Sequence, residues 1–285
     1  PIGMNPVTKL WEFYHLRSAW DGLSDPAGLA IPVHRADGSI ETNGDSGIVF
    51  ALLPGGTFTM GAQKQDAAGL NFDPQAQADE APFEVTLEPF FLARCEVTQG
   101  QWARLWSGDE SLRRPSLYTA GRNLGGQLST LANPVEQVDW SMCNELMRNH
   151  GLQLPSEAQW EYGCRSGTAT PWFCGLEELE LFANVADASA LANGVPWACE
   201  SWSDGHTVHA PVASFRPNAF GLYDVHGNVW EWCLDASGAS NRGSRGGSFS
   251  DPAAYSRSAN RNSDSPAIRD GIVGLRAARA LWFRD

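Results

Sequence analysis

The sequence predicts an α+β fold that is irregular and rich in loops. Its 285 residues include 29 glycines and 12 tryptophans, and 42% of them are hydrophobic. Many glycines combined with many large rings indicate turns and short elements held around buried aromatic side chains. The sequence contains short apolar runs typical of strands and a few N-cap residues typical of helix starts, and it has no internal repeat. Irregular folds of this length do occur as one unit.

The N-terminal segment predicts a helix followed by an arm. Residues 4–20 carry a broad apolar stripe that is typical of a helix face. The stripe consists of Leu10, Trp11, Phe13, Tyr14 and Leu16. A Gly-, Pro- and Asp-rich stretch continues to about residue 45 and indicates an extended arm. We therefore expect residues 1–45 to form a helix and an arm packed on one domain, which comprises residues 46–285.

Strands are predicted in the next fifty residues. The apolar run 47–53 ends at a Pro-Gly-Gly turn, and residues 57–61 follow as the return strand. Residues 62–82 are polar and predict a loop. Residues 83–97 alternate well enough to predict further strands. The core candidates there are Phe90, Phe91 and Leu92.

Three helices are predicted behind these strands. Thr98 and Ser156 are suitable N-cap residues for two of them. The helix between these two begins around residue 140. Its apolar face consists of Met142, Leu146 and Met147. Residues 107–132 and 165–220 contain many turn formers and predict irregular structure.

The charge of the chain limits its partners. The net charge is −13 and the isoelectric point is about 4.8, whereas binding to nucleic acid or to an anionic membrane needs a surplus of Lys and Arg. We therefore expect no nucleic-acid partner. No apolar run approaches the ~20 residues that cross a bilayer, so we expect no membrane insertion. An acidic chain suits bound cations, basic partners or plain solubility, and these alternatives stay open.

The six cysteines favour a reducing compartment. None belongs to a Cys-x-x-Cys pair, and none combines with histidine at the spacing of a zinc site. Cys143 and Cys164 occur in apolar helical contexts, where we expect buried free thiols. Since no signal peptide is visible, we expect a cytoplasmic protein. The even number of cysteines leaves disulfides open.

Seven motifs occur in order along the chain. They are PGGTFTMG at residues 54–61, EVTQGQW at 96–102, PVEQVDW at 134–140, LPSEAQWEY at 154–162, NAFGLYDVHGNVWEW at 218–232, RGGSF at 245–249 and GLRAAR at 274–279. Together they resemble the formylglycine-generating enzyme family, also called the sulfatase-modifying-factor family. The resemblance spans roughly residues 45–282. It implies a compact, irregular α+β fold related to C-type lectins.

Two positions that carry the family's chemistry differ in this chain. The resemblance implies that oxidase members have two cysteines soon after the Gly-Gly-Ser motif, which bind copper(I) and help to oxidise a substrate cysteine. These positions hold Asp251 and Ser256. Because a carboxylate and a hydroxyl are poor ligands for copper(I), we expect no copper. Trp230, Ser248 and Tyr255 match residues that line the family's active-site pocket.

The resemblance also implies two structural calcium ions. The first calcium set matches the side chains of Asp224 and Glu231 and the carbonyls of Gly227 and Val229. The second calcium set matches the side chains of Asn184 and Asp204 and the carbonyls of Val185 and His206. Calcium takes about 6–8 hard oxygens, which such groups can supply. The alternative is that Asp224 and Glu231 only cap turns by accepting backbone N–H bonds.

The final segment has the composition of a variable binding face. The family's relatives encoded by diversity-generating retroelements lack the thiols and place such a face just before a G-(F/L)-R-x-A-R ending, which this chain shares. Residues 250–264 are rich in Ser, Asn, Asp, Ala and Tyr, which make adaptable contacts. The candidate binding face consists of Trp230, Ser248, Ser250, Asp251, Ala254, Tyr255, Ser256, Ser258, Asn260 and Asn262. The alternative is an ordinary polar loop of the family.

These observations predict a non-catalytic module that binds a ligand, and a protein or peptide is the expected partner. The alternative is a sulfatase-modifying-factor-type, metal-dependent oxidase with altered active-site residues that acts on a protein or peptide side chain. A sensor or adaptor module of a larger system is a third reading. Other chemistries find little support, because the six histidines are scattered and neither a nucleophile elbow nor a phosphate-binding loop occurs.

Overall fold

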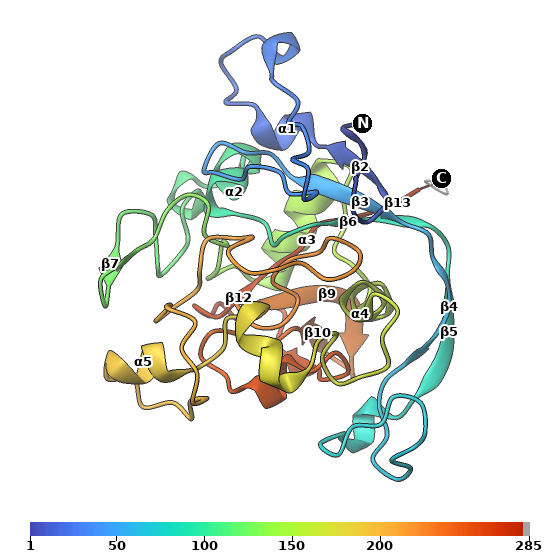
Figure 1. Cartoon of the computed structure of the whole chain (residues 1–285). Coiled ribbons are helices and arrows are strands. Elements are labelled where there is room, and N and C mark those ends of the chain that lie inside the picture. Colours follow the sequence, from blue (N-terminus) through green and yellow to red (C-terminus); the bar gives the residue numbers. More distant parts are fainter. Residues whose placement is uncertain (282–285) are drawn as a thin grey trace.

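The computed structural model describes residues 1–281 and builds them around two small sheets (Figure 1). The first sheet has the strand order β1-β2-β3-β6-β13, and all its neighbouring strands are antiparallel. Its strands are β1 (Gly3–Met4), β2 (Trp11–Tyr14), β3 (Val49–Leu53), β6 (Phe90–Ala93) and β13 (Ala278–Ala280). Because β6 pairs with both β3 and β13, this sheet joins the N-terminal and C-terminal parts of the chain.

The second sheet carries the candidate binding segment. Its order is β11-β10-β9-β12, and its strands are β9 (Trp230–Ser237), β10 (Asn241–Arg245), β11 (Asn262–Asp264) and β12 (Val273–Gly274). Strand β12 runs parallel to β9, whereas the other pairs are antiparallel. The segment leaves the sheet after β10 and returns through β11, so both of its ends are fixed by strand pairing.

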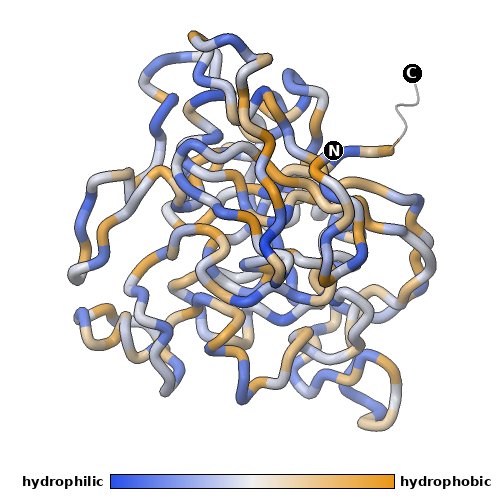
Figure 2. The backbone as a smooth tube through the Cα atoms, turned by 45° about the horizontal axis from the view of Figure 1, so that its top comes forward, coloured by the Kyte–Doolittle hydropathy of each residue, from blue (hydrophilic) through white to orange (hydrophobic). Residues whose placement is uncertain are grey.

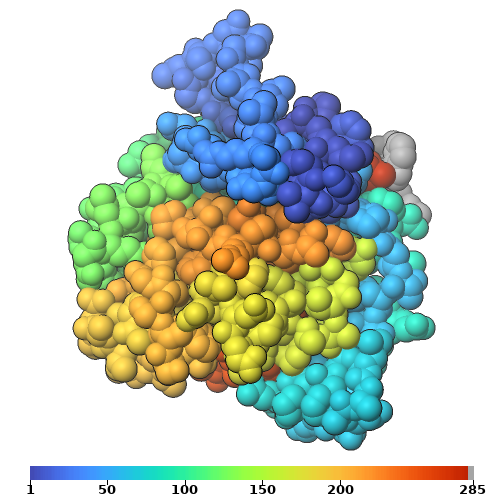
Figure 3. Space-filling view, viewed as in Figure 1, coloured from blue at the N-terminus to red at the C-terminus, as the bar shows by residue number. Residues whose placement is uncertain are grey.

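Two hairpins project from this centre. The long one pairs β4 (Gly56–Met60) with β5 (Phe83–Leu87), and it curves along one side of the molecule to a tip at residues 61–82 (Figure 1). The short one pairs β7 (Asn123–Leu124) with β8 (Gln127–Leu128). Figure 3 shows the tip of the long hairpin, in cyan, as a lobe at one end of the molecule, while the N-terminal residues, in blue, cover the opposite end.

The helices are short, and two of them begin at the predicted caps, Thr98 and Ser156. They are α1 (Leu16–Ala19), α2 (Gln99–Leu105), α3 (Trp140–Asn149), α4 (Glu157–Arg165) and α5 (Ala188–Ala192). Thr98 and Ser156 each form a capping box with a glutamine, and Asp139 accepts from the backbone N–H of Met142. These bonds satisfy free N–H groups of the first turn. Short 3₁₀ segments lie at Pro26–Gly28, Ala78–Glu80, Glu110–Leu112, Leu176–Leu181 and Ala253–Ser256.

Large aromatic side chains fill the core between the sheets and helices. Trp102, Trp160 and Trp232 are each at most 1% exposed. Trp102 and Trp232 belong to the larger apolar cluster, and Trp160 belongs to a second cluster that includes residues of β3 and β6. In Figure 2 a hydrophobic stretch of the backbone, in orange, crosses the centre of the molecule. Much of the tryptophan-rich composition therefore serves burial.

The helix predicted for residues 4–20 is wrong. This stretch forms β1, β2 and only the single turn of α1. Phe13 packs edge-on against Phe91 with ring centroids 5.2 Å apart, and the buried carboxylate of Glu12 accepts from Arg94 at 2.9 Å. Pairing of β2 with the edge of β3 satisfies backbone groups of both strands. This tertiary pairing overrides a weak local preference for helix.

The other predicted elements are confirmed. Residues 47–53 contain β3, the return strand is β4, residues 83–97 contain β5 and β6, and the three predicted helices are α2, α3 and α4. All six cysteines lie within the described residues and are free, and Cys143 and Cys164 are buried. No helix in the described part of the chain is long and apolar enough to span a membrane. The division at residue 45 stays a prediction, and β2 pairs with β3 across it.

Acid is expected to destabilise this fold through His15. Its ring packs edge-on against Phe50. Burial lowers the pKa of His15 from 6.5 to about 4, and nearby positive charges, first His150, act in the same direction. Between these two pH values the unfolded state binds a proton that the folded state does not. The contribution of neutral His15 to the free energy of unfolding is therefore fully present above pH 6.5 and is lost as the pH falls toward 4.

The variant His15→Gln isolates this contribution. Urea unfolding at pH 7 and at pH 4.5 should show that the natural protein loses about 2 kcal/mol more stability on acidification than the variant does. Equal losses in the two proteins would show that His15 does not control this part of the pH dependence.

Candidate functional site

Two glycines turn the chain from β10 into the candidate site. Gly246 and Gly247 have φ angles of 104° and 74°, which residues with a Cβ rarely adopt. A Cβ at Gly247 would also lie 3.0 Å from the backbone nitrogen of Ser256. The turn therefore brings the start of the segment into close contact with its 3₁₀ segment, Ala253–Ser256.

Asp251 is the centre of a hydrogen-bonded group in this segment. Its Oδ2 accepts from the indole Nε1 of Trp230 at 2.9 Å and from Oγ of Ser248 at 2.5 Å. The Ser248 hydroxyl also lies 3.0 Å from Oγ of Ser250. Burial raises the pKa of Asp251, while the bonds from Ser248 and Trp230 oppose the rise. The carboxylate of Asp251 thus fixes the side chains of Trp230 and Ser248 by hydrogen bonds.

Ser256 is equally engaged inside the fold. It is fully buried, its hydroxyl donates to the carbonyl of Ala253 at 2.9 Å, and it accepts from Nε1 of Trp172 at 3.1 Å. The two positions that match the family's cysteines therefore offer one hard carboxylate and one buried hydroxyl. Copper(I) selects soft sulfur ligands, which these residues do not provide.

Only some residues of the predicted binding face are exposed to solvent. Tyr255 is 50% exposed. The partly exposed members of the candidate face are Ser250, Asp251, Ala254, Asn260 and Asn262. The buried members, each at most 4% exposed, are Trp230, Ser248, Ser256 and Ser258. These four form hydrogen bonds inside the fold and do not reach a ligand in this conformation.

Arg257 joins this segment to the tip of the long hairpin. Its guanidinium donates to Asp73 at 2.5 Å and to Glu80 at 2.9 Å, and its Nε donates to the carbonyl of Ala254 at 2.8 Å. The three charged side chains are buried. Burial alone would lower the pKa of Arg257, but its bonds with Glu80 and Asp73 raise it above the usual range. Sequence reasoning missed this contact, because the partners lie at least 177 residues apart.

The first calcium set does not present a free glutamate. Both carboxylate oxygens of Glu231 accept from Arg276, at 2.6 and 2.9 Å, and Oε2 also accepts from Nε1 of Trp160 at 2.7 Å. Burial alone would lower the pKa of Arg276, but Glu231 holds it above the usual range. A guanidinium therefore occupies the place where the ion would bind Glu231. In this arrangement the set Asp224, Gly227, Val229 and Glu231 does not fit calcium.

The second calcium set keeps unpaired oxygens. Oδ1 of Asn184 and Oδ2 of Asp204 are buried and have no hydrogen-bond partner among the described residues. Burial raises the pKa of Asp204 to about 8, and nearby Asp187 contributes to the rise. Asp187, which the motif did not include, also accepts the backbone N–H of Asp204. Hard oxygens without donors suit calcium, so these two oxygens are compatible with the ion, and the carbonyls of Val185 and His206 stay predicted ligands.

Side-chain ligands alone do not complete either site. Within residues 1–281, no group of three or more His, Cys, Asp and Glu side chains is arranged to hold a metal ion. An ion would therefore need amide, carbonyl or water oxygens as well, which are common ligands of calcium.

The chain matches a family model and several named relatives. The model of the sulfatase-modifying factor enzyme 1-like domain matches residues 39–281. A formylglycine-generating enzyme from Streptomyces coelicolor is 33% identical over 51% of this chain and 52% of its own length. The inactive C-alpha-formylglycine-generating enzyme 2 of Mus musculus is 30% identical over 51% of this chain and 48% of its own length. The chain thus spans about half the length of these curated relatives.

Solved structures share the fold. PvdO from Pseudomonas aeruginosa matches with a TM-score of 0.61 and 28% identity over 82% of this chain and 94% of its own. Variable protein 1 of Treponema denticola matches with a TM-score of 0.62 and 21% identity over 84% of this chain and 97% of its own. The predicted irregular α+β fold, shared by formylglycine-generating-enzyme-like and C-type-lectin-like proteins, is therefore confirmed.

Proposed function

This chain belongs to the sulfatase-modifying factor enzyme 1-like family, and we propose that it is a non-catalytic module that binds a protein or peptide. The observation that carries the proposal is the state of the two positions that hold cysteines in the oxidases. Asp251 bonds Trp230 and Ser248, and Ser256 bonds Trp172 and Ala253. These hydrogen bonds stabilise the segment. Because the two residues are aspartate and serine, these positions offer no pair of sulfur ligands for copper.

The family supports both catalytic and non-catalytic members. One relative of this chain is named a formylglycine-generating enzyme, and another is named an inactive form. Loss of the reactive sulfurs is therefore compatible with keeping the scaffold, because the core tryptophans and capped helices that stabilise the fold do not depend on these two residues.

We place the ligand at the outer face around Tyr255. A tyrosine supplies a large, rigid contact area, and neighbouring Ser250 and Asn260 supply adaptable hydrogen bonds. Arg257 holds this surface against the hairpin tip through Asp73, which limits the conformational entropy that binding would remove. Variation of these exposed positions between copies of the gene is part of the proposal. So are a structural calcium ion at the second calcium set and a cytoplasmic setting, which six free cysteines suit.

Replacement of Tyr255 tests the proposed face. Peptides selected from a random displayed library on the natural protein should bind the variant Tyr255→Ala about 30-fold more weakly, since a central tyrosine typically contributes about 2 kcal/mol or more. Titration calorimetry measures the loss. The matched control is Phe83→Ala, because Phe83 is 51% exposed but lies on β5 of the long hairpin. The control should bind as the natural protein does.

Two results would overturn the proposal. One is selected peptides whose affinity is insensitive to Tyr255→Ala. The other is copper-dependent oxygen consumption by the purified protein with a cysteine-containing peptide, which would support the oxidase alternative.

A further inference from the structure

A pocket beside α2 collects positive charge in an acidic protein. Its volume is about 450 Å³, which lies within the usual range of roughly 300–1,000 Å³ for small-molecule sites. The charged residues of its lining are Arg104, Glu110, Arg113 and Arg114, and we call it the arginine pocket. Three positive side chains and one negative side chain leave an excess of two positive charges. Because Asp and Glu outnumber Lys and Arg by 33 to 20 in the chain, this local excess is unusual.

Two of these arginines have N–H groups to spare. Arg114 is exposed, and its guanidinium forms no hydrogen bond or ion pair with residues 1–281. Arg113 is anchored to α2, because its Nε donates to the carbonyl of Ala103 at 3.0 Å. One of its terminal nitrogens lies 3.4 Å from Glu110, and the two side chains are 47% and 81% exposed. Since such exposed pairs are weak, Glu110 competes little with a better acceptor.

Arg104 adds a charge that its hydrogen-bond partners do not neutralise. Its three nitrogens donate to the carbonyls of Ser18, Gly44 and Ser46 at 2.6 to 2.9 Å. These acceptors are polar but uncharged. Burial lowers the pKa of Arg104, although the nearby charge of Asp45 acts in the opposite direction. A negative group in the pocket would stabilise the charged form of this side chain.

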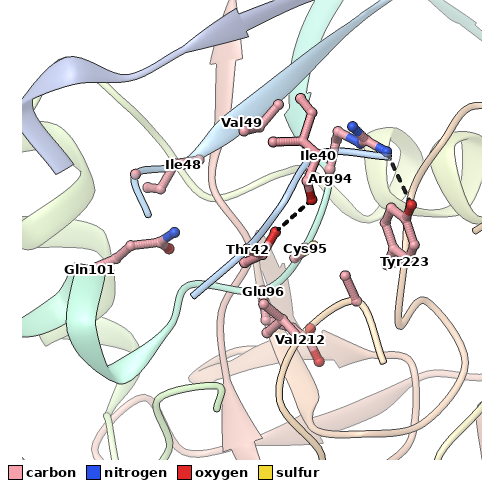
Figure 4. Close-up of a pocket in the computed structure, with 12 residues that line it drawn as sticks. Ile40, Thr42, Ile48, Val49, Arg94, Cys95, Glu96, Gln101, Val212 and Tyr223 are labelled. Atoms are coloured by element: carbon pink, nitrogen blue, oxygen red, sulfur yellow. Dashed lines mark hydrogen bonds between the residues drawn. The ribbon is translucent and has the colours of Figure 1, made fainter. Parts of the chain in front are cut away.

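A second cavity near α2 differs in both size and charge. Its volume is about 30 Å³, which leaves room for about one or two water molecules. Figure 4 shows Gln101 of α2 on one side of it and Arg94, bonded to Tyr223, on another. Arg94 also pairs with Glu12 at 2.9 Å, so its charge is already neutralised. The arginine pocket is therefore the better ligand site of the two.

We propose that a small oxyanion with two or more negative charges binds in the arginine pocket, where Arg113 and Arg114 donate to it and the charge of Arg104 stabilises it. Guanidinium groups match the oxygens of phosphates and carboxylates. The described lining has no aromatic ring that could stack on a base, so the ligand class is a non-aromatic phosphate or polycarboxylate. The pocket does not include Tyr255, and the site does not depend on the proposed binding face.

Titration calorimetry at low ionic strength, with inorganic phosphate and with succinate, tests the site. At least one of these anions should bind the natural protein. The variants Arg113→Gln and Arg114→Gln should each bind it at least about tenfold more weakly, because each loses charge-assisted hydrogen bonds. Stronger binding of phosphate would identify a phosphate ligand, and stronger binding of succinate would identify carboxylates. Both replaced side chains are exposed, so the variants should fold.

The matched control is Arg216→Gln. Arg216 is also exposed but does not line the pocket, and its replacement changes the net charge equally. This control should bind the anion as the natural protein does. Equal binding by the natural protein and Arg114→Gln, or an equal loss in Arg216→Gln, would overturn the proposal. So would binding of polyglutamate when neither small anion binds, since that result would indicate a surface for an acidic protein.

Discussion

The double variant Asp251→Cys/Ser256→Cys is expected to bind copper(I) at least about 100-fold more tightly than the natural protein, since even an outer-shell partner of a metal ligand changes affinity by about 10- to 100-fold. Two thiolates would replace a hard carboxylate and a buried hydroxyl with the soft ligands that copper(I) selects. Ser256→Cys changes little in volume at a position that is fully buried. Competition with a coloured copper(I) chelator without oxygen measures the change.

The existing cysteines require a control for this measurement. Cys174 and Cys199 are partly buried single thiols that can bind copper weakly. The variant Asp251→Ser/Ser256→Ala also removes the carboxylate but adds no sulfur, so it should bind copper(I) as weakly as the natural protein. Equal affinity of the two double variants would show that these positions do not form a copper site and would remove the main chemical argument for a binding module.

The variant Arg276→Met should lose about 3–5 kcal/mol of unfolding free energy in calcium-free buffer, which is the usual effect of removing one partner of a buried ion pair. Arg276 is fully buried. It donates to Glu231 and to the carbonyls of Ala93 and Tyr223, at 3.1 and 2.9 Å. Methionine fills similar space but leaves the carboxylate of Glu231 without its cation. Urea unfolding followed by tryptophan fluorescence measures the loss.

An exposed ion pair provides the control for Arg276→Met. Arg35 and Glu41 lie 2.9 Å apart, with side chains 58% and 74% exposed, and Arg35→Met should change stability by less than about 1 kcal/mol. If the two variants lost similar amounts, Arg276 would not be the main electrostatic support of β9 and the C-terminal segment.

Local signals predicted the helices well. Thr98 and Gln101, and likewise Ser156 and Gln159, are three residues apart, so the two bonds of each capping box depend only on nearby sequence. The N-terminal stretch differs, because its strand β2 needs β3, which lies 35 or more residues further along the chain. A stripe of apolar side chains could not show which long-range partner would be available.

Prediction of the candidate site also succeeded only where residue type alone was enough. The motif identified Asp251 and Tyr255, and the structure places both at the surface in part. Serine is common in binding faces, yet Ser248, Ser256 and Ser258 are all fully buried. Serine is small enough to form hydrogen bonds inside a tight turn, so its presence in a polar segment does not indicate exposure.

The family, and the absence of cysteine at positions 251 and 256, follow from the amino-acid sequence alone, because both depend only on which side chains stand at given places in the motifs. Which charged groups are paired depends on the folded chain. Arg276 pairs with Glu231 from 45 residues away, and Arg257 pairs with Asp73 from 184 residues away. Pairing of buried charges depends on distances in space, and no spacing along the chain specifies them.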